Sequence, residues 1–577
     1  MDIRFKLRRM LCSLPGRLFC LLLVVASFGT LAHSAMGQSQ VLAENPTAQP
    51  QPVAAVSDSV LVQGAELERE GRWGEALSLY QKTLKDFPKN KSIQTRRSVA
   101  RIHFDLGRRY SDSSFLKTIE STDGKKAKNV YAEVLLKVQS YYVDEPNWAD
   151  IASYGLTALE VALMSPEFQK INLPGISDLD VRATIVATRK RLESASVNNR
   201  HDAYLVADDT AKFLSEKIGL SQQATVYEFV CGAISALDPY SAFMSSNQYS
   251  ETMSQIEGNF VGLGVELRTH KDHLEIVNVI PGGSAAVGGI VKGDRVSAVD
   301  GKSVAQIGSE RAADLMRGVE GSFVGITVDR DERPQTVQLE RRRVEIPSVD
   351  QVGIVDVKNG VAYIRLTNFQ KTTARDFDAA LWKLHRDGMR SLIVDVRGNP
   401  GGLLSASVEV ADRFVSDGII VSTRGRNPME DFTHQANLAS TWRVPLVVLV
   451  DGNSASASEI FAAAIRDHQR GKIVGHQSYG KGSVQGIFPL NVSGGGVRLT
   501  TAKFYSPTGK PINQVGVKAD VIVHETAKTS VEPTGENGDP GLQVGIQTAL
   551  RTMQARKSAS TTSSLRSELQ KRQFADR

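Results

Sequence analysis

The spacing of apolar residues divides the chain into a helical amino half and a carboxyl half in which strands and helices alternate. Between residues 126 and 245 apolar residues recur every three or four positions, which predicts amphipathic helices. This stretch ends at the turn sequence Leu-Asp-Pro-Tyr-Ser (237–241), and strand-like segments begin near Phe260. Leu392–Asp395 and Leu446–Val450 are short apolar runs, as buried strands of an α/β sheet are. The pattern predicts several domains, with the helices first and the α/β domain last.

A second spacing, within residues 64–88, predicts an antiparallel helix pair. Small residues such as Gly64 and Ala76 recur where two helices would touch, and Pro88 closes the second helix. The pattern resembles one tetratricopeptide repeat, and residues 93–111 echo it in another register. One repeat cannot bury its own apolar face, so neighbouring helices must cover it. Two roles stay open: a groove that binds a regulatory protein, and a helical packing module.

Length and charge narrow the classes of function. A chain of 577 residues exceeds what one hydrophobic core organises, so three or four domains are expected. Of the formal charge of +6, a surplus of four lies within residues 1–34, and the remaining chain is nearly neutral. That remainder has no polybasic stripe, so nucleic acid is not an expected partner.

The amino end has the pattern of a secretory signal. A basic stretch, Arg4–Arg17, precedes the apolar run Leu18–Ala32. This run is 15 residues long, which is shorter than the roughly 17–25 residues that span a bilayer. We therefore expect a cleaved signal peptide at 1–37, a linker at 38–57, and an exported protein that is periplasmic or associated with the cell envelope. An uncleaved amino-terminal anchor is the alternative.

Cysteine usage agrees with this picture. Cys12 and Cys20 would leave with the signal, and Cys231 alone would remain. A single cysteine forms no intramolecular disulfide, so packed cores must supply the stability. Its apolar neighbours place Cys231 in such a core.

Residues 256–341 carry the motifs of a peptide-binding domain. The loop Gly262, Leu263 and Gly264 leads into a strand at Val265, and its glycines permit a tight turn whose amides form a nest for a carboxylate. The other motifs are Val-Ile-Pro-Gly-Gly-Ser-Ala-Ala at 279–286, Gly-Asp-Arg-Val at 293–296 and Val-Asp-Gly-Lys-Ser-Val at 299–304. Their order resembles PDZ domains, which implies that the loop captures the carboxyl end of a chain. A PDZ fold kept as a structural spacer is the alternative.

Three loops between residues 345 and 525 carry candidate chemistry. Arg-Gly-Asn-Pro-Gly-Gly at 397–402 builds a backbone that can approach a substrate closely. The segment 451–460, Asp-Gly-Asn-Ser-Ala-Ser-Ala-Ser-Glu-Ile, turns sharply into a helix, where a serine gains exposure and the positive end of the helix dipole. In 478–485, Ser-Tyr-Gly-Lys-Gly-Ser-Val-Gln, the lysine can act as a base if burial lowers its pKa from about 10.4 toward neutrality.

The residues alone leave the nucleophile open. Ser454 and Ser458 both suit a helix N-cap, and a lone lysine is usually a solvated surface residue. A histidine base is disfavoured because Ser456 lacks the Gly-x-Ser-x-Gly elbow of serine–histidine hydrolases. No His, Cys and Asp grouping has metal-ligand spacing, so we expect no metal and no cofactor.

The order and spacing of these loops resemble the carboxyl-terminal processing peptidases (tail-specific proteases, peptidase family S41), in which a PDZ domain is inserted into a serine protease of crotonase-like fold. The resemblance runs from about Leu237 to Leu550 and departs at Tyr240, where the family usually has His. In that family a serine of Ser-Ala-Ser-Ala-Ser-Glu-Ile pairs with a lysine 25 residues downstream. The resemblance implies that Ser456 is the nucleophile and that Lys481 is the general base. It also implies roles for several further residues. These are Gln485 to orient the amine, Asp467 as an acidic residue, and the amides of Ala457 and of Gly401 or Gly402 as oxyanion donors.

We therefore expect a multidomain protein with an α-helical amino-terminal region, a β-rich PDZ domain and an α/β crotonase-like (ClpP/crotonase) protease core. The expected segments are a tetratricopeptide-like region at 58–112, a helical domain at 113–255, the PDZ domain at 256–341, the protease core at 342–525 and a tail with a short helix at 526–577.

The expected function is that of an exported serine endopeptidase that cleaves proteins near their carboxyl ends, with a Ser–Lys dyad and a PDZ domain that binds the substrate's C-terminus. The expected partners are protein and peptide substrates, a regulatory protein on the helical region, and a second copy of the chain. Two alternatives belong to other classes: a catalytically silent PDZ and tetratricopeptide adaptor, and an acyl- or retinoid-binding relative with a crotonase-like core.

Overall fold

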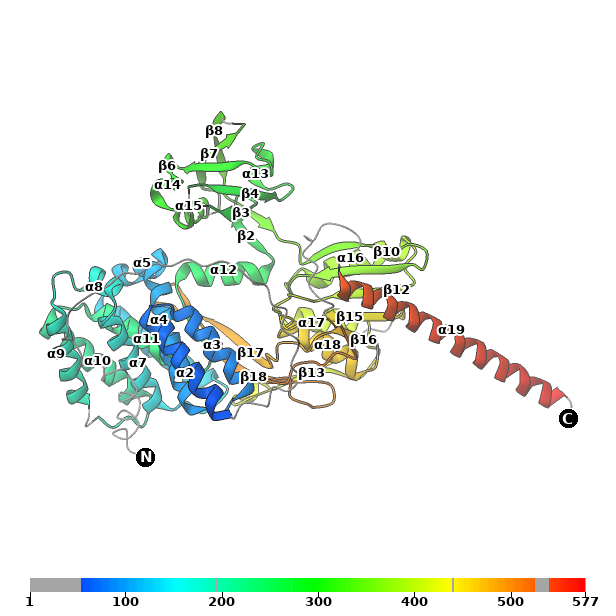
Figure 1. Ribbon diagram of the computed structural model, residues 1–577, viewed down its shortest axis with the longest axis horizontal. Coiled ribbons are helices and arrows are strands. Elements are labelled where there is room, and N and C mark those ends of the chain that lie inside the picture. The colour runs from blue at the N-terminus through cyan, green and yellow to red at the C-terminus, as the bar shows by residue number, and fades with distance from the viewer. Residues whose placement is uncertain are drawn as a thin grey trace, which may run out of the picture. The chain divides into compact units, whose positions relative to one another are not determined.

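The computed structural model describes residues 53–192, 195–270, 272–318, 320–331, 333–437, 441–524 and 539–575 (Figure 1). The expected signal peptide, 1–37, lies outside them. Of the described residues, 53–140, Glu145–Ser246 and Ile487–Arg498 form a helical unit, and Tyr141–Asp144, Asn247–Gly486 and those from Leu499 on form an α/β unit. In the described part of the chain, no helix has the length and apolar character to cross a bilayer.

The helical unit begins with the predicted helix pair. Helix α2 (Val53–Arg69) starts inside the stretch expected to be linker, and it is followed by α3 (Trp73–Asp86) and α4 (Lys91–Ser111). A Cβ atom on Gly64 would lie 2.1 Å from the Tyr80 hydroxyl, so a small residue is required where the two helices meet, as predicted. Ile93 and Ala100 of α4 join Tyr80 in one apolar cluster, so a third helix covers the pair.

A second group of helices follows, with α7 and α11 at its centre. Gly155 of α7 and Gly232 of α11 let the two helices approach, because a Cβ at either position would collide with the other helix. The buried Glu228 of α11 accepts hydrogen bonds from Arg109 and Tyr110, which compensates for burying its charge. The bounds are α5 Ser113–Ser121, α6 Gly124–Tyr141, α7 Trp148–Leu163, α8 Pro166–Asn172, α9 Asp178–Leu192, α10 Arg200–Ile218, α11 Gln222–Ser235, β1 Ala242–Met244 and α12 Ser246–Glu257.

The expected PDZ domain, which lies in the α/β unit, forms a sheet with the strand order β3-β4-β5-β7-β8, and β6 pairs with β5. Strand β3 (Val265–Thr269) lies at an edge of this sheet and directly follows the loop 262–264, so one side of β3 is available to an added strand. The other elements are β2 Asn259–Gly262, β4 Leu274–Val279, α13 Ser284–Val287, β5 Arg295–Val299, β6 Lys302–Ser303, α14 Val304–Ile307, α15 Ser309–Met316, β7 Phe323–Arg330, β8 Arg333–Glu340 and β9 Arg342–Glu345, which pairs with β2.

The segment expected to be the protease core is built on a sheet in the order β10-β11-β12-β15-β16-β19, parallel from β11 onward. The strands are β10 Val349–Asp356, β11 Val361–Leu366, β12 Ser391–Asp395, β15 Leu446–Val450, β16 Lys472–Gly475 and β19 Val521–Ile522, and the helices are α16 Thr373–Arg386, α17 Leu404–Asp412 and α18 Ala457–Asp467. A smaller sheet contains β13 Ile419–Gly425, β14 Thr433–Gln435, β17 Ser483–Pro489 and β18 Gly496–Tyr505, and η1 covers Pro428–Glu430.

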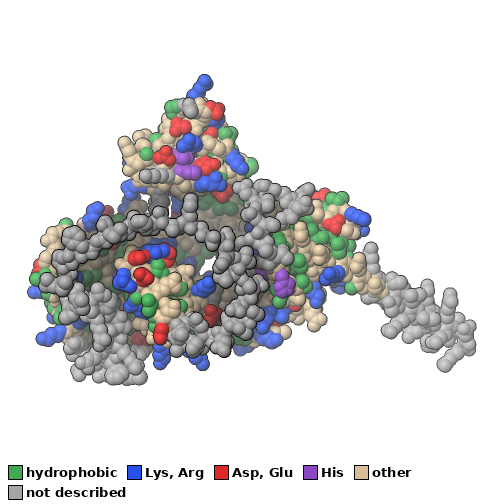
Figure 2. Space-filling model, in the orientation of Figure 1, with side chains coloured by type: hydrophobic (Ala, Val, Ile, Leu, Met, Phe, Trp, Pro, Cys, Tyr) green, Lys and Arg blue, Asp and Glu red, His purple; other side chains and the backbone are tan. Residues whose placement is uncertain are grey.

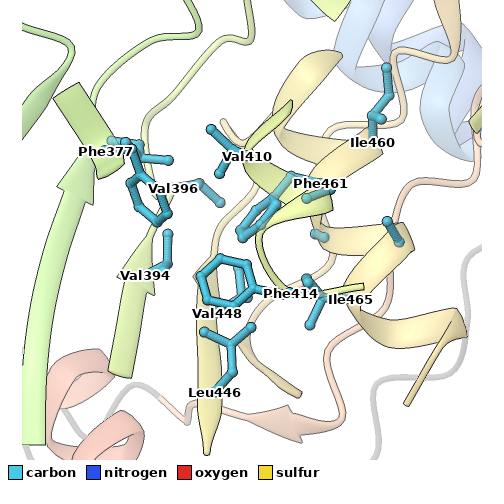
Figure 3. Packing of buried hydrophobic residues seen from close by; sticks show 14 of the residues in the cluster. Phe377, Val394, Val396, Val410, Phe414, Leu446, Val448, Ile460, Phe461 and Ile465 are labelled. Carbon is cyan, nitrogen blue, oxygen red and sulfur yellow. The ribbon is translucent and has the colours of Figure 1, made fainter. Parts of the chain in front are cut away.

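Alternate residues of the core strands face two different layers. Val394 and Val448 point toward Phe414 and Phe461 of the layer that contains α16, α17 and α18 (Figure 3). The residues between them, such as Ile393 and Leu449, belong to the cluster on the opposite face. Both faces are therefore covered, which explains why these strands are continuously apolar in sequence.

The second face is covered by the carboxyl-terminal helix α19 (Pro540–Ala575), whose Leu542, Ile546 and Leu550 pack there. The helix expected in the tail thus docks on the core, but the expectation that it is short was wrong. The helix has 36 residues. No glycine or proline interrupts the sequence after Gly545, which favours a long helix.

Candidate active site

Ser456 lies at the turn between β15 and α18, where it is the N-cap residue of the helix. Its backbone has φ 56° and ψ −114°, a region that residues with a Cβ rarely adopt. Such a conformation costs about 1–3 kcal/mol. Because the start of a helix carries partial positive charge, a developing alkoxide or oxyanion at this position is stabilised.

The two neighbouring serines have structural roles. The Ser454 hydroxyl donates to the carbonyl oxygen of Val396 at 2.8 Å, and the Ser458 hydroxyl donates to that of Asn399 at 3.0 Å. Both side chains are buried, whereas Ser456 is partly exposed. Exposure therefore distinguishes Ser456 among the three, and the other two hold the loop 396–399 against the helix start.

The side chain that connects Ser456 with the loop of Lys481 is Glu459, which the sequence analysis did not single out. Its Oε2 accepts hydrogen bonds from the backbone amides of Ser456 at 2.8 Å and Lys481 at 2.9 Å. Its Oε1 accepts from the Gly480 amide and from the Ser478 hydroxyl, both at 2.6 Å. A fully buried carboxylate thus joins the two loops. Burial raises the pKa of Glu459, and these four hydrogen bonds oppose that rise.

Lys481 is partly buried, and the glycines on either side of it are required by close packing. Gly480 has φ 89°, and a Cβ on Gly482 would lie 2.1 Å from the Asn513 nitrogen. Gln485 lies on β17, where its amide nitrogen donates to the Ser483 hydroxyl at 2.9 Å. The structure thus fixes the backbone around Lys481 from both sides.

The glycine loop 397–402 approaches the Ser456 turn. A Cβ on Gly401 would lie 2.8 Å from the Cβ of Ser456 and 3.0 Å from the amide nitrogen of Ala457. Gly402 has φ 140°, and a Cβ there would collide with the carbonyl oxygen of Phe369. Close packing therefore requires glycine at both positions, and the approach of this backbone to a substrate stays a prediction.

Among the amides that could donate to an oxyanion, one already donates to an acceptor within the protein and two do not. The Gly401 amide donates to Oδ1 of Asn399 at 2.8 Å, so of the two alternatives, Gly401 and Gly402, the first already has an acceptor within the loop. Among the described residues, the amides of Ala457 and Gly402 have no acceptor. Ala457 is the first residue of α18, and the first amides of a helix lack intrahelical acceptors. Ala457 and Gly402 remain as candidate donors.

The structure does not bring Asp467 to the site. This residue ends α18, eleven residues after Ser456, which places it about 16 Å away along the helix axis. Its carboxylate accepts hydrogen bonds from the hydroxyls of Ser506 at 2.6 Å and Thr508 at 2.8 Å, which ties the end of the helix to the loop after β18.

Ion pairs that the sequence motifs did not indicate lie at the base of the glycine loop. Asp395, at the end of β12, is buried and accepts from Tyr363 and Arg397. The sequence feature that could have indicated these contacts is Asp395 itself, an aspartate at the end of an apolar strand. In the described part of the chain, no three His, Cys, Asp or Glu side chains lie close enough together to hold a metal ion.

In the PDZ domain, the loop 262–264 turns its carbonyl groups inward. The Leu263 oxygen accepts from the Ala285 amide and the Gly264 oxygen accepts from Ile280, both at 2.8 Å. Gly264 has φ 79°, and Leu263 is buried in the domain core. The loop therefore has a fixed shape at the start of the edge strand β3, where Val265 begins.

An α/β core with a strained serine at a helix start, a lysine loop tied to it and a fused PDZ domain defines a serine hydrolase that handles peptides. The family model of peptidase family S41 matches residues 360–523, and the PDZ domain model matches 252–329. A carboxy-terminal-processing protease of Bartonella bacilliformis is 36% identical over 310 residues, which are 52% of this chain and 70% of that protein. A carboxyl-terminal-processing protease of Picosynechococcus is 34% identical over 320 residues, 54% of this chain and 76% of that protein.

Among solved structures, a photosystem II D1 C-terminal processing protease is 25% identical, with a TM-score of 0.37, and the match covers 69% of this chain and 92% of that one. The chain belongs to peptidase family S41, the carboxyl-terminal processing proteases, and it is a serine peptidase with a PDZ domain.

Proposed function

We propose that the protein is an exported endopeptidase that cleaves other proteins near their carboxyl ends with a dyad of Ser456 and Lys481. The observation that carries the proposal is the double role of Glu459, whose Oε2 binds the backbone amides of both residues. One carboxylate oxygen thereby sets the distance between the two loops. Family membership supports the same pairing.

In the proposed reaction, neutral Lys481 removes the proton from the Ser456 hydroxyl, and the alkoxide attacks the scissile carbonyl carbon. The amides of Ala457 and Gly402 donate to the tetrahedral oxyanion. The protonated Lys481 then gives its proton to the leaving amine, and an acyl-enzyme forms. Water, deprotonated by the same amine, releases the acyl group and restores the serine. Gln485 helps to orient the Lys481 amine.

The test uses an unfolded protein substrate and two active-site variants. Ser456→Ala and Lys481→Ala should each lower cleavage below detection while the melting temperature stays within a few degrees of the wild type. Lys472→Ala is the matched control, because this lysine is exposed at the start of β16 and should leave activity unchanged. Full activity of either active-site variant would refute the dyad.

We further propose that the PDZ domain holds the substrate's terminal carboxylate at the loop 262–265. The edge strand β3 supports this, because a bound segment can extend the sheet there. A peptide with a free, apolar carboxyl end should be cleaved with a higher kcat/KM than the same peptide ending in an amide. Equal values for the two would assign the domain to a spacer role and leave the dyad intact.

Export and partners are part of the proposal and are tested separately. The apolar run at 18–32, followed by small residues, supports cleavage of a signal near residue 37. Amino-terminal sequencing of the protein from the cell envelope fraction should start close to that position, whereas an intact amino end would indicate an anchor. A regulatory protein on the helices α2–α4, and self-association, are checked by cross-linking in the same fraction.

A further inference from the structure

The carboxyl-terminal helix is tied to the active site through a single arginine. The Arg397 guanidinium donates to Asp395 through Nε and Nη2, with a shortest distance of 2.6 Å. It also donates to both carboxylate oxygens of Asp539, at 2.8 Å from Nη1 and 2.7 Å from Nη2. Asp539 immediately precedes α19 and lies beyond the residues that the S41 family model matches. The two carboxylates hold the planar guanidinium from two sides.

Arg397 is the first residue of the loop that faces Ser456. The next amide, that of Gly398, donates to Asp451 at 3.0 Å, and Asn399 binds both the Gly401 amide and, through its own carbonyl, the amide of Ala455. Every residue from 397 to 399 is therefore fixed by a polar contact. Because the backbone of Gly401 lies so close to Ser456 that an added Cβ would be 2.8 Å from the Cβ of Ser456, a shift at Arg397 is passed to the amides beside Ser456.

The residues at the start of α19 bind the Arg397 guanidinium and leave space for it. Oδ1 of Asp539 accepts the Leu542 amide at 3.0 Å, so the same carboxylate caps the helix and binds Arg397. A Cβ on Gly541 would lie 2.6 Å from Nη1 of Arg397, so glycine leaves room for the cation. Arg397 holds the pKa of Asp539 below its ordinary value.

We propose that Asp539 is a positioning residue for catalysis: through Arg397 it fixes the loop 397–402, so that the carboxyl-terminal helix completes the active site. The inference rests on the proposed function where it predicts a change in kcat. Where it predicts a change in the hydrogen exchange of the loop amides, it rests on the geometry alone. Without Asp539, the Arg397 side chain is held by Asp395 only, and the loop gains freedom next to Ser456.

Asp539→Asn is the sharpest variant, because asparagine keeps the size and the helix cap but loses the charge. It should lower kcat about tenfold and leave KM within about twofold, since a misplaced oxyanion donor weakens the transition state and not substrate binding. Asp539→Glu, which keeps the charge, should recover part of the loss. Leu550→Ala is the control, because it weakens the docking of α19 without touching Arg397.

Hydrogen exchange of the amides 398–402 gives a second readout that needs no catalysis. Exchange should be faster in Asp539→Asn than in the wild type and unchanged in Leu550→Ala. Wild-type kcat and wild-type exchange in Asp539→Asn would overturn the inference. An equal loss of kcat in Leu550→Ala would do the same, because helix docking alone would then explain it. If Ser456→Ala cleaves normally, the proposed dyad fails, and the exchange data still decide the role of Asp539.

Discussion

The carboxylate of Glu459 accepts a hydrogen bond from the backbone amide of Lys481, with 2.9 Å between Oε2 and the nitrogen. The same oxygen accepts the amide of Ser456, which lies in a different loop. Ser456 and Lys481 come from segments that follow two neighbouring parallel strands, β15 and β16. A buried acceptor between two such loops fixes their separation without taking part in bond making.

Replacing Glu459 by Gln should therefore impair the site as a whole. Glutamine offers one acceptor oxygen and an amide group that donates, so at least two of the four donors around it lose their partner. We expect kcat/KM to fall about 10²-fold or more, since small displacements of reacting groups have effects of this size. Labelling of Ser456 by a fluorophosphonate should slow in parallel. Unchanged labelling would show that Glu459 does not set the geometry of the nucleophile.

The same variant gives a prediction about pH. Burial raises the pKa of Glu459 above its ordinary value, so the folded protein binds this proton more tightly than the unfolded chain does. The stabilising contribution of the protonated side chain is complete below the unfolded-state pKa and is lost as the pH rises through the folded-state pKa. The stability of the wild type relative to Glu459→Gln should thus decrease from pH 4 to pH 7. Thermal unfolding across this range measures it, and a relative stability that rises with pH would contradict the assigned direction.

Gly401→Ala should damage both activity and stability. The added methyl group would lie 2.8 Å from Ser456 Cβ, and φ 109° is unfavourable for any residue with a side chain. We expect a loss of about 1–3 kcal/mol in the free energy of unfolding from overpacking and loss of detectable cleavage. Gly452→Ala is the control, because nothing lies within 4 Å of its added Cβ and its φ is ordinary. Equal cleavage activity and equal stability of the two variants would show that the loop moves to accommodate the added methyl group.

The features of the site that depend on residues close together in the sequence could be predicted from it. The apolar run Leu446–Val450 was identified as a strand because buried strands are continuously apolar. The glycines at 401 and 402 indicated a loop of special backbone conformation, and close packing requires glycine at both. The partner of Arg397 could not be predicted in this way, since Asp539 lies 142 residues away and nothing near it marks an ion pair. Glu459 was visible in the motif, but an acidic residue in the first turn of a helix is ordinary there. The role of Glu459 as an acceptor depends on the loop that contains Lys481, and the sequence alone does not show that this loop packs against it.

Cys231 provides a probe of the helical unit. The thiol lies in α11 beside the buried Glu228, and burial raises its pKa to about 12. The native protein without the signal segment should not react with a thiol reagent at pH 8, and reaction should begin only when the helical unit opens. The labelling rate against denaturant concentration measures this opening. Rapid labelling without denaturant would contradict the packing of α7 against α11.

The strain at Ser456 predicts an unusual order of stability among active-site variants. The residue keeps φ 56° because the turn from β15 into α18 requires it, and alanine at this position must adopt the same conformation. Glycine adopts it without penalty, so Ser456→Gly should be more stable than Ser456→Ala by about 1 kcal/mol, even though glycine usually lowers stability. Both variants lack the hydroxyl and should be inactive, which makes the comparison independent of catalysis. Urea unfolding of the two proteins measures the difference. If Ser456→Ala were the more stable of the two, the backbone at the nucleophile would not be strained.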